Sequence, residues 1–296
     1  MALTARMISQ RRRRLPRAPV GGDDHSQAFK DFEAAGWSAN AGGYELLTGR
    51  ITARVAELLL DAAGVGAGVR VLDVGCGTGA MCAAAAARGA RPTGVDLADG
   101  MLAAARRAHP RLEFVAGDAE ALPCADASFD AALGAFVVNH VPHPERAAAE
   151  LRRVLAPSGR VALAMWGPPE RVPFLGLFDA AMRAAGVGAG DVLPPGPPAF
   201  RFADAGALRA LLAQAGFERV AVREHELRHA VADAGELWHG VQTGSVRTAA
   251  QLRALDDGQR ARVRAALEEL LEERRASGGL ELEAAVLVAA GVSPAA

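Results

Sequence analysis

Glycines at every second position, Gly75, Gly77 and Gly79, form the part of the sequence whose residue types most clearly indicate ligand binding. They follow the segment 69–74, in which Val69, Val71 and Leu72 supply the apolar, β-branched character of a short strand covered on both faces. The alanine-rich run 80–87 then predicts a helix, because alanine is the best helix former. A turn without Cβ atoms lets the main chain approach a ligand closely, and the helix N-terminus presents free N–H groups to the same crevice.

Asp96 ends a second predicted strand, residues 91–96. Neighbouring strands of a doubly wound sheet end at one crevice, so we expect the Asp96 carboxylate beside the glycine turn, where it can accept hydrogen bonds from a ribose diol. The pattern Gly75-x-Gly77-x-x-Ala80, with an acid about 20 residues further on, also satisfies the dinucleotide fingerprint. These residues alone therefore do not separate NAD from another adenosine cofactor.

The motif Asp-x-Gly-x-Gly-x-Gly, which begins at Asp73, resembles the first motif of class I S-adenosylmethionine (SAM)-dependent methyltransferases. The segment from about residue 45 to 166 is similar to their small-molecule branch, typified by quinone-biosynthesis methyltransferases. Three features favour SAM over NAD: the acid at Asp73, the third glycine and the triplet 117–119 (Gly-Asp-Ala). The resemblance implies a Rossmann-like, doubly wound α/β sheet of seven strands, six parallel and one antiparallel, with helical cap insertions.

The resemblance also implies roles for residues around the cofactor. It makes the Asp118 carboxylate an acceptor for the adenine amino group and the Ala119 N–H a donor to a ring nitrogen; Asp118 could otherwise be only a helix cap. It places Met101 against the adenine and Tyr44 at the methionine end of SAM, although core packing would explain both residues. The predicted SAM-binding residues are Tyr44, Asp73, Gly75, Cys76, Gly77, Gly79, Asp96, Leu97, Met101, Asp118, Ala119 and Ala135.

His140 is the candidate for acid–base chemistry. It lies in the segment 138–142, which matches a loop that faces the substrate in relatives. Imidazole titrates near neutrality, so His140 could act as a general base, or it could simply anchor the loop. Methyl transfer from a sulfonium needs an aligned nucleophile, so a dedicated acid–base pair is not required. The segment 129–136 predicts the fourth strand, and nothing resembling Asn/Asp-Pro-Pro-Tyr follows it. This absence favours O-, N- or C-methylation of a small molecule over methylation of a nucleic-acid base or a protein amide.

Composition narrows the class of protein further. The net charge is −1, and arginines gather in the first 20 residues, so the body is acidic, which argues against a nucleic-acid partner. No run of about 18 apolar residues appears, so we expect no membrane span. Cys76, Cys82 and Cys124 lack metal-ligand or disulfide spacing, which fits a reducing cytoplasm; Cys76 is expected to be a small turn residue rather than a reactive thiol. The oligomeric state is not indicated.

The order of patterns predicts the domain organisation. We expect a flexible, arginine-rich tail (1–26), a SAM-binding core with an N-terminal helical segment (27–166), a cap insertion (167–203), more core (204–228), a helical cap insertion (229–279), and a last strand with a tail (280–296). The predicted function is methyl transfer from SAM to a small acceptor. The alternatives are an NAD-dependent oxidoreductase and a SAM-binding protein that does not transfer methyl.

Overall fold

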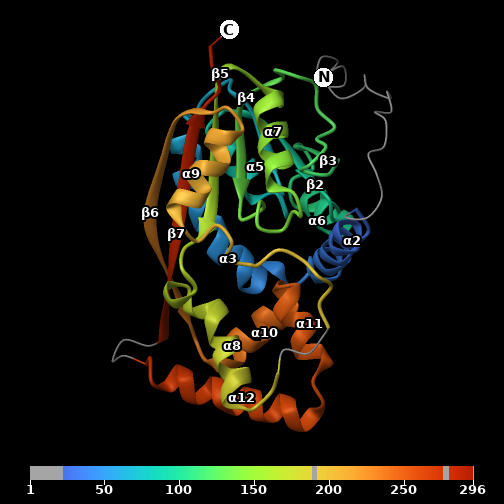
Figure 1. Cartoon of the computed structure of the whole chain (residues 1–296), viewed down its shortest axis with the longest axis vertical. Helices are drawn as coiled ribbons and strands as arrows, with labels where there is room; N and C mark the ends of the chain where they lie inside the picture. Colours follow the sequence, from blue (N-terminus) through green and yellow to red (C-terminus); the bar gives the residue numbers. More distant parts are fainter. Residues whose placement is uncertain (1–22, 189–191, 276–279, 296) are drawn as a thin grey trace.

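The predicted strands form a seven-stranded sheet in the computed structural model, which describes residues 23–188, 192–275 and 280–295 (Figure 1). The strands are β1 (Arg70–Val74), β2 (Arg91–Asp96), β3 (Glu113–Ala116), β4 (Phe129–Ala135), β5 (Leu155–Trp166), β6 (Glu218–Val231) and β7 (Leu280–Val292). Their order is β3-β2-β1-β4-β5-β7-β6, and β7 pairs antiparallel with both β5 and β6. The predicted sheet of six parallel strands and one antiparallel strand is confirmed.

Helices cover both faces of this sheet. They are α4 (Ala56–Ala62), α5 (Ala80–Ala87), α6 (Asp99–Ala108), α7 (Pro144–Val154) and α9 (Ala205–Gln214). Successive strand residues point to opposite faces: Val71 belongs to the apolar cluster that contains Leu59 of α4, and Leu72 to the cluster that contains Leu151 of α7. Burial on both sides explains why Val71 and Leu72, neighbours that point to opposite faces, are both apolar.

Four cap helices lie together at one end of the molecule, below the sheet in Figure 1. They are α8 (Pro173–Ala184), α10 (Ala234–Gly244), α11 (Arg247–Ala254) and α12 (Asp257–Glu272). The end of β6 pairs with the start of β7, where Val231 lies opposite Leu280, so α10 to α12 are inserted into a long β6–β7 hairpin. Phe178 of α8 and Leu267 of α12 are fully buried in the same apolar cluster, which holds the cap helices together.

The chain before the sheet forms helix α2 (Asp23–Asn40), a 3-10 turn (Tyr44–Leu46), α3 (Thr48–Thr52) and a second 3-10 turn (Ala53–Val55) that leads into α4. The predicted tail lies outside the described residues up to position 22, and its last four residues belong to α2. Apolar residues on one stripe, among them Ile51, Val55 and Leu59, predict a single amphipathic helix over 51–62, whereas the backbone is interrupted there by the 3-10 turn. Ile51, Val55 and Leu59 are nevertheless all buried. The spacing of the side chains, rather than the pattern of backbone hydrogen bonds, determines which face is buried.

Helix α9 is followed by its C-cap Ala215 and then by Gly216, whose φ of 87° is the left-handed conformation common where a helix stops. Among the residues that the structure describes, no helix is both long and apolar enough to cross a membrane.

The packing of α10 on the N-terminal segment generates a stability prediction. A Cβ on Gly240 of α10 would lie 2.4 Å from the Cβ of Leu47, whereas a Cβ on Gly176 of α8 would meet only the Pro169 carbonyl oxygen at 3.4 Å. Overpacking costs about 1–3 kcal/mol, and alanine gains about 1 kcal/mol over glycine in a helix. We expect Gly240→Ala to lower the free energy of unfolding by about 1 kcal/mol or more and Gly176→Ala to raise it, both measured by urea unfolding. Equal effects from the two variants would contradict the close packing of α10.

Candidate functional site

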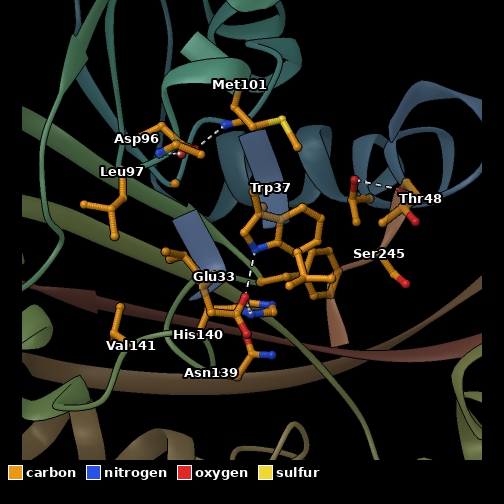
Figure 2. Close-up of a pocket in the computed structure, with 18 of the residues that line it drawn as sticks. Glu33, Trp37, Thr48, Asp96, Leu97, Met101, Asn139, His140, Val141 and Ser245 are labelled. Atoms are coloured by element: carbon orange, nitrogen blue, oxygen red, sulfur yellow. Dashed lines mark hydrogen bonds and ion pairs between the residues drawn. The ribbon is translucent and has the colours of Figure 1, made fainter. Parts of the chain in front are cut away.

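The carboxyl ends of the central parallel strands border a cavity of about 230 Å³ (Figure 2). Val74 lines it from β1, Asp96 from β2 and Trp166 from β5. Trp37 of α2 and Arg247 of α11 line it from the opposite side. The cavity therefore lies between the sheet, the N-terminal helix and the cap helices, at the edge where open α/β sheets bind ligands.

The glycine turn forms one wall of this cavity. Gly75, Gly77 and Gly79 have φ values of 70°, 53° and 88°, which residues with a Cβ rarely adopt. A Cβ on Gly75 would meet Val137 at 2.7 Å, while a Cβ on Gly77 would meet no atom within 4 Å. Gly77 thus presents bare main chain to open space beside the cavity, as the sequence predicted for a turn that a ligand approaches closely.

Asp96 has the geometry of a diol acceptor. Its Oδ2 accepts a hydrogen bond from the Gly77 N–H at 2.8 Å, and its Oδ1 accepts one from the Ala98 N–H at 2.8 Å. Burial raises the pKa of this carboxyl, while the backbone N–H donors oppose the shift. Each carboxylate oxygen can accept more than one hydrogen bond, so acceptor capacity is left for two ligand hydroxyls.

The structure brings most of the predicted site residues together. Ten of the thirteen line the cavity: Tyr44, Gly75, Gly77, Asp96, Leu97, Met101, Asp118, Ala119, Ala135 and His140. Asp73, Cys76 and Gly79 do not line it. The Tyr44 hydroxyl is hydrogen-bonded to Thr52 Oγ1 at 2.9 Å, and burial raises the pKa of Tyr44 to about 12, so this phenol stays neutral.

Asp73 lies behind the cavity wall rather than on it. Its side chain is 1% exposed, and the Cys82 thiol of α5 donates to its Oδ2 at 3.5 Å. Burial, together with the nearby charge of Asp96, raises the pKa of Asp73 to about 7, although the Cys82 hydrogen bond opposes the shift. A buried carboxylate with only a weak thiol donor is costly in its charged form.

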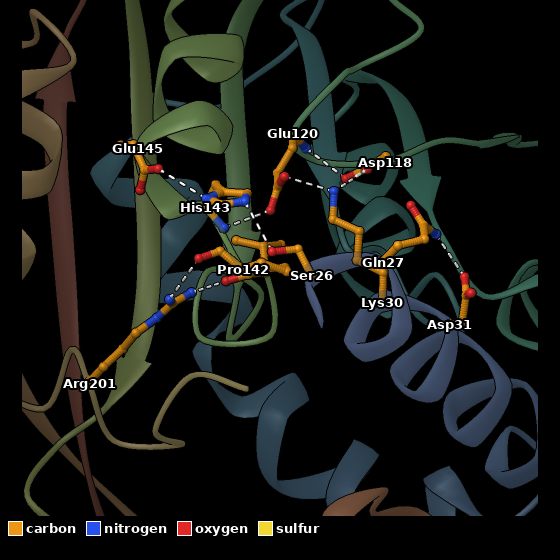
Figure 3. Close-up of polar contacts among 11 residues, drawn as sticks. Ser26, Gln27, Lys30, Asp31, Asp118, Glu120, Pro142, His143, Glu145 and Arg201 are labelled. Carbon is orange, nitrogen blue, oxygen red and sulfur yellow. Dashed lines mark hydrogen bonds and ion pairs between the residues drawn. The ribbon is translucent and has the colours of Figure 1, made fainter. Parts of the chain in front are cut away.

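Asp118 is held by a lysine that the sequence reasoning did not assign to the site (Figure 3). Lys30 Nζ of α2 lies 2.7 Å from Asp118 Oδ2 and 2.7 Å from Glu120 Oε2. Burial disfavours the ammonium charge, but the two carboxylates outweigh it and raise the pKa of Lys30. Lys30 is the only lysine of the chain, and this rarity was the one available signal.

A second polar cluster joins α2 to the loop that carries His140 (Figure 2). The Glu33 carboxylate accepts hydrogen bonds from Trp37 Nε1 at 2.9 Å and Arg247 Nε at 2.8 Å, and its Oε2 lies 2.9 Å from His140 Nδ1. Sequence reasoning missed Glu33, Trp37 and Arg247 as site residues. Phe29, Glu33 and Trp37 recur at four-residue spacing, which places an acid on the aromatic face of α2 and was the signal for two of the three.

Aromatic side chains line the other half of the cavity. The rings of Phe136 and Trp166 are stacked with centroids 3.9 Å apart and an interplanar angle of 22°, and Phe174 of α8 meets Trp166 edge-on at 5.1 Å. Phe136 has a φ of 57°, a conformation uncommon for a bulky residue, directly after the end of β4. The polar half, around Asp96 and Asp118, and this apolar half belong to one continuous cavity.

Fold and cavity together define a Rossmann-like α/β protein with a cavity at the carboxyl edge of the sheet, where this class of fold binds its ligands. A family model described as a methyltransferase domain matches residues 72–163. Demethylmenaquinone methyltransferase of Renibacterium salmoninarum is 40% identical over 134 residues, which cover 45% of this chain and 56% of that protein. The enzyme of the same name from Beutenbergia cavernae is 36% identical over 170 residues, 55% of this chain and 68% of that protein.

A solved phosphoethanolamine N-methyltransferase of Haemonchus contortus shares the fold, with a TM-score of 0.54 and 17% identity over 95% of this chain and 61% of that one. The chain belongs to the class I SAM-dependent methyltransferases. Family membership favours SAM over NAD as the nucleotide. The chain spans little more than half the length of the first relative, and the family match ends before the cap helices.

The raised pKa of Asp73 predicts a pH-dependent stability. Between its ordinary pKa of 3.8 and the folded value of about 7, the native state holds a proton that the unfolded state has lost. Stability therefore falls as pH rises through this window and is level above it. We therefore compare the free energies of unfolding of Asp73→Asn and the parent. The difference, variant minus parent, should increase by about 1.4 kcal/mol for each pH unit as the pH rises from 4 to 7.

Urea unfolding at pH 5 and pH 8, without ligand, measures this difference. Asp61→Asn, which changes an exposed carboxylate, is the matched control and should show no such growth. A difference between Asp73→Asn and the parent that is the same at both pH values would contradict the raised pKa, because the polarity of asparagine contributes equally at each.

Proposed function

We propose that this protein transfers the methyl group of SAM to a small, flat, apolar acceptor. The observation that carries the proposal is the single cavity in which a polar half, bordered by Asp96 and Asp118, continues into an aromatic half. A nucleoside needs the polar groups of the first half, and a flat, apolar acceptor needs the ring surfaces of the second half. Family membership supplies the reaction class.

The polar half fits the adenosine of SAM. Gly77 leaves open space where a Cβ would stand, and Asp96 keeps acceptor capacity on both oxygens for the ribose hydroxyls. Met101 and Leu97 supply apolar surface on the same cavity, and Asp118 also lines it, which supports the adenine contact that the resemblance implies. We therefore propose that the ten predicted residues on the cavity wall contact the cofactor or the acceptor.

The aromatic half supports a flat, apolar acceptor. Stacked Phe136 and Trp166 and the edge of Phe174 offer ring surfaces, and offset or edge-on ring contacts are preferred by aromatic ligands. The two relatives described above are named for demethylmenaquinone, so a quinone-like ring is the acceptor shape that their names suggest. Phe174 of α8 and Arg247 of α11, which also line the cavity, lie outside the matched family segment, so part of the proposed acceptor wall comes from the cap helices.

The chain's own contribution to the reaction is alignment and exclusion of water. Bound SAM would supply an already activated methyl group. The residues of α2, α8 and α11 that line the cavity enclose the acceptor against the strand ends, where Ala135 leaves room for the reacting groups. Orientation of two reactants can supply about 7–11 kcal/mol of the barrier reduction, so alignment is the main task of this site.

Removing the Asp96 carboxylate should weaken SAM binding. Charged hydrogen bonds to a diol contribute about 1.5–3 kcal/mol each, so we expect Asp96→Ala to raise the dissociation constant for SAM about tenfold or more. Asp99→Ala, which removes an exposed carboxylate three residues further on, is the control and should bind as the parent does. Calorimetric titration measures both, and an unchanged affinity of Asp96→Ala would exclude Asp96 from the cofactor site.

Label transfer tests the reaction itself. With methyl-labelled SAM and a panel of naphthols and naphthohydroquinones, we expect the label to appear in a small product and the demethylated cofactor to accumulate. SAM binding without any labelled product, also with a small-molecule cell extract, would favour the alternative of a SAM-binding protein that does not transfer methyl. A thermal shift with NADH but none with SAM would overturn the proposal.

A further inference from the structure

We propose that Glu33 is a positioning residue that holds His140 as the general base of this site, and that the acceptor therefore carries a weakly acidic hydroxyl, as a phenol or hydroquinone does. This inference rests on the proposed function and goes beyond it, because it names the group that reacts. The argument starts from the surroundings of Glu33, which lies in the middle of α2 on the side that faces the cavity.

Glu33 is a buried carboxylate whose partners come from three parts of the chain. Its side chain is 4% exposed, and it meets Trp37 Nε1 within α2, His140 Nδ1 in the loop after β4, and Arg247 Nε in α11. Burial would raise the pKa of Glu33, but the neighbouring His140 and Arg247 lower it to about 2. The carboxylate is therefore ionised throughout the neutral range.

An ionised carboxylate can only accept hydrogen bonds, so the contact with His140 determines which ring nitrogen carries the proton. In neutral His140 the proton must be on Nδ1, which faces Glu33 Oε2 at 2.9 Å. Nε2 then carries the lone pair, and no described residue forms a hydrogen bond with it. His140 itself lines the cavity. The imidazole is thus in the tautomer that a general base needs, with its free nitrogen available to a ligand.

The ring of His140 is also held in place from several directions. Trp37 contacts it edge-on, with ring centroids 5.5 Å apart and planes at 82°. The backbone N–H of His140 donates to the Val137 carbonyl at 2.9 Å. The Arg201 guanidinium donates to the backbone carbonyls of Val138 and Val141, which flank His140 in the loop. A base held by both its side chain and its loop loses little orientation when the acceptor binds.

The charges of the cluster suit proton transfer. With His140 neutral, the Glu33 carboxylate is balanced by the Arg247 guanidinium, whose Cζ also lies 4.8 Å from the Phe29 ring centroid. The acceptor O–H would lose its proton to Nε2, the oxygen would form the new bond to the methyl carbon, and the electron pair of the broken C–S bond would stay on sulfur. The imidazolium formed in this step would lie directly against the Glu33 carboxylate, which stabilises it.

The need for a base selects the chemistry of the acceptor. A thioether has no proton to lose, and a neutral amine attacks before it loses one, so neither needs a base beside the methyl group. A phenol or hydroquinone is mostly protonated at neutral pH and becomes a good nucleophile when its proton leaves. The aromatic stack of Phe136, Trp166 and Phe174 suits the flat ring that carries such a hydroxyl.

The first test reads the tautomer directly and does not depend on turnover. Nitrogen NMR of the histidine-labelled full chain, bound to the demethylated cofactor, should show the Nδ1-protonated form for His140, whose signals are assigned by their loss in His140→Gln. Glu33→Gln should redistribute the proton between the two nitrogens. Glu145→Gln is the matched control, since this exposed carboxylate lies 3.5 Å from Nδ1 of His143 and should leave His140 unchanged. An Nε2-protonated His140 in the parent would overturn the positioning role.

The second test measures kinetics with phenols and naphthols of graded acidity as acceptors. General-base catalysis typically contributes about 10²–10⁴-fold, so we expect Glu33→Gln to lower kcat at least tenfold for the least acidic acceptors. The loss should shrink for acidic phenols, which ionise without help, while KM and the affinity for SAM change less than about threefold. An equal loss for all acceptors, or a loss of SAM affinity in proportion, would show a merely structural role and overturn the proposal.

Glu33→Asp covers the case in which Glu33→Gln fails to fold. It keeps the charge that Arg247 needs but draws the carboxylate back from the imidazole by one methylene, so the same kinetic pattern is expected. Label found in an amine or thioether and in no hydroxyl compound would overturn the acceptor class. Failure of the proposed function itself would look different: no SAM binding by the parent, or no labelled product of any kind.

Discussion

The buried carboxylate of Glu33 is the contact on which the shape of the site depends. Three segments that are distant in the sequence meet there: α2, the loop after β4 and the first turn of α11. Its ionised state, with a pKa of about 2, is held by His140 and Arg247, and removing either partner would leave a buried charge poorly compensated. Lys30 repeats the arrangement one turn earlier in α2, where it bridges Asp118 and Glu120. Two ion-pair clusters therefore hold α2 against the rest of the cavity wall.

The sheet contributes the fixed part of the same site. Parallel pairing of β1 with β2 and β4 brings the strand ends to one edge, where the glycine turn and Asp96 come together. The family match covers this part of the chain and stops at residue 163. Beyond that residue, side chains of the cap helices α8, α10 and α11 line the cavity, and α10 and α11 are inserted between β6 and β7. The shared segment thus supplies Asp96 and Asp118 together with Phe136 and His140, and the segment after it supplies Trp166, Phe174 and Arg247.

Local patterns in the sequence predicted the fold and the polar half of the site because their causes are local. The glycine turn needs its positive φ values, and Asp96 ends a strand whose neighbours are set by the doubly wound order. Asp73 belongs to the same motif, yet its side chain turns toward Cys82 of α5, since a strand alternates its faces and this one is buried. The Glu33–Arg247 contact joins residues 214 positions apart, and nothing in either neighbourhood indicates the other. The sequence shows Glu33 on the aromatic face of α2, but it does not indicate the partners of this carboxylate.

The position of α10, α11 and α12 inside the β6–β7 hairpin has an evolutionary consequence. A hairpin can accept a different insert between its paired ends without disturbing the register of the other strands, so this part of the roof is a replaceable module. Grafting another roof would change which rings fit against Trp166 while the nucleotide side stays intact. Such an exchange has one condition. The incoming segment must bring a cation to the position of Arg247, because the buried carboxylate of Glu33 would otherwise lose its guanidinium partner.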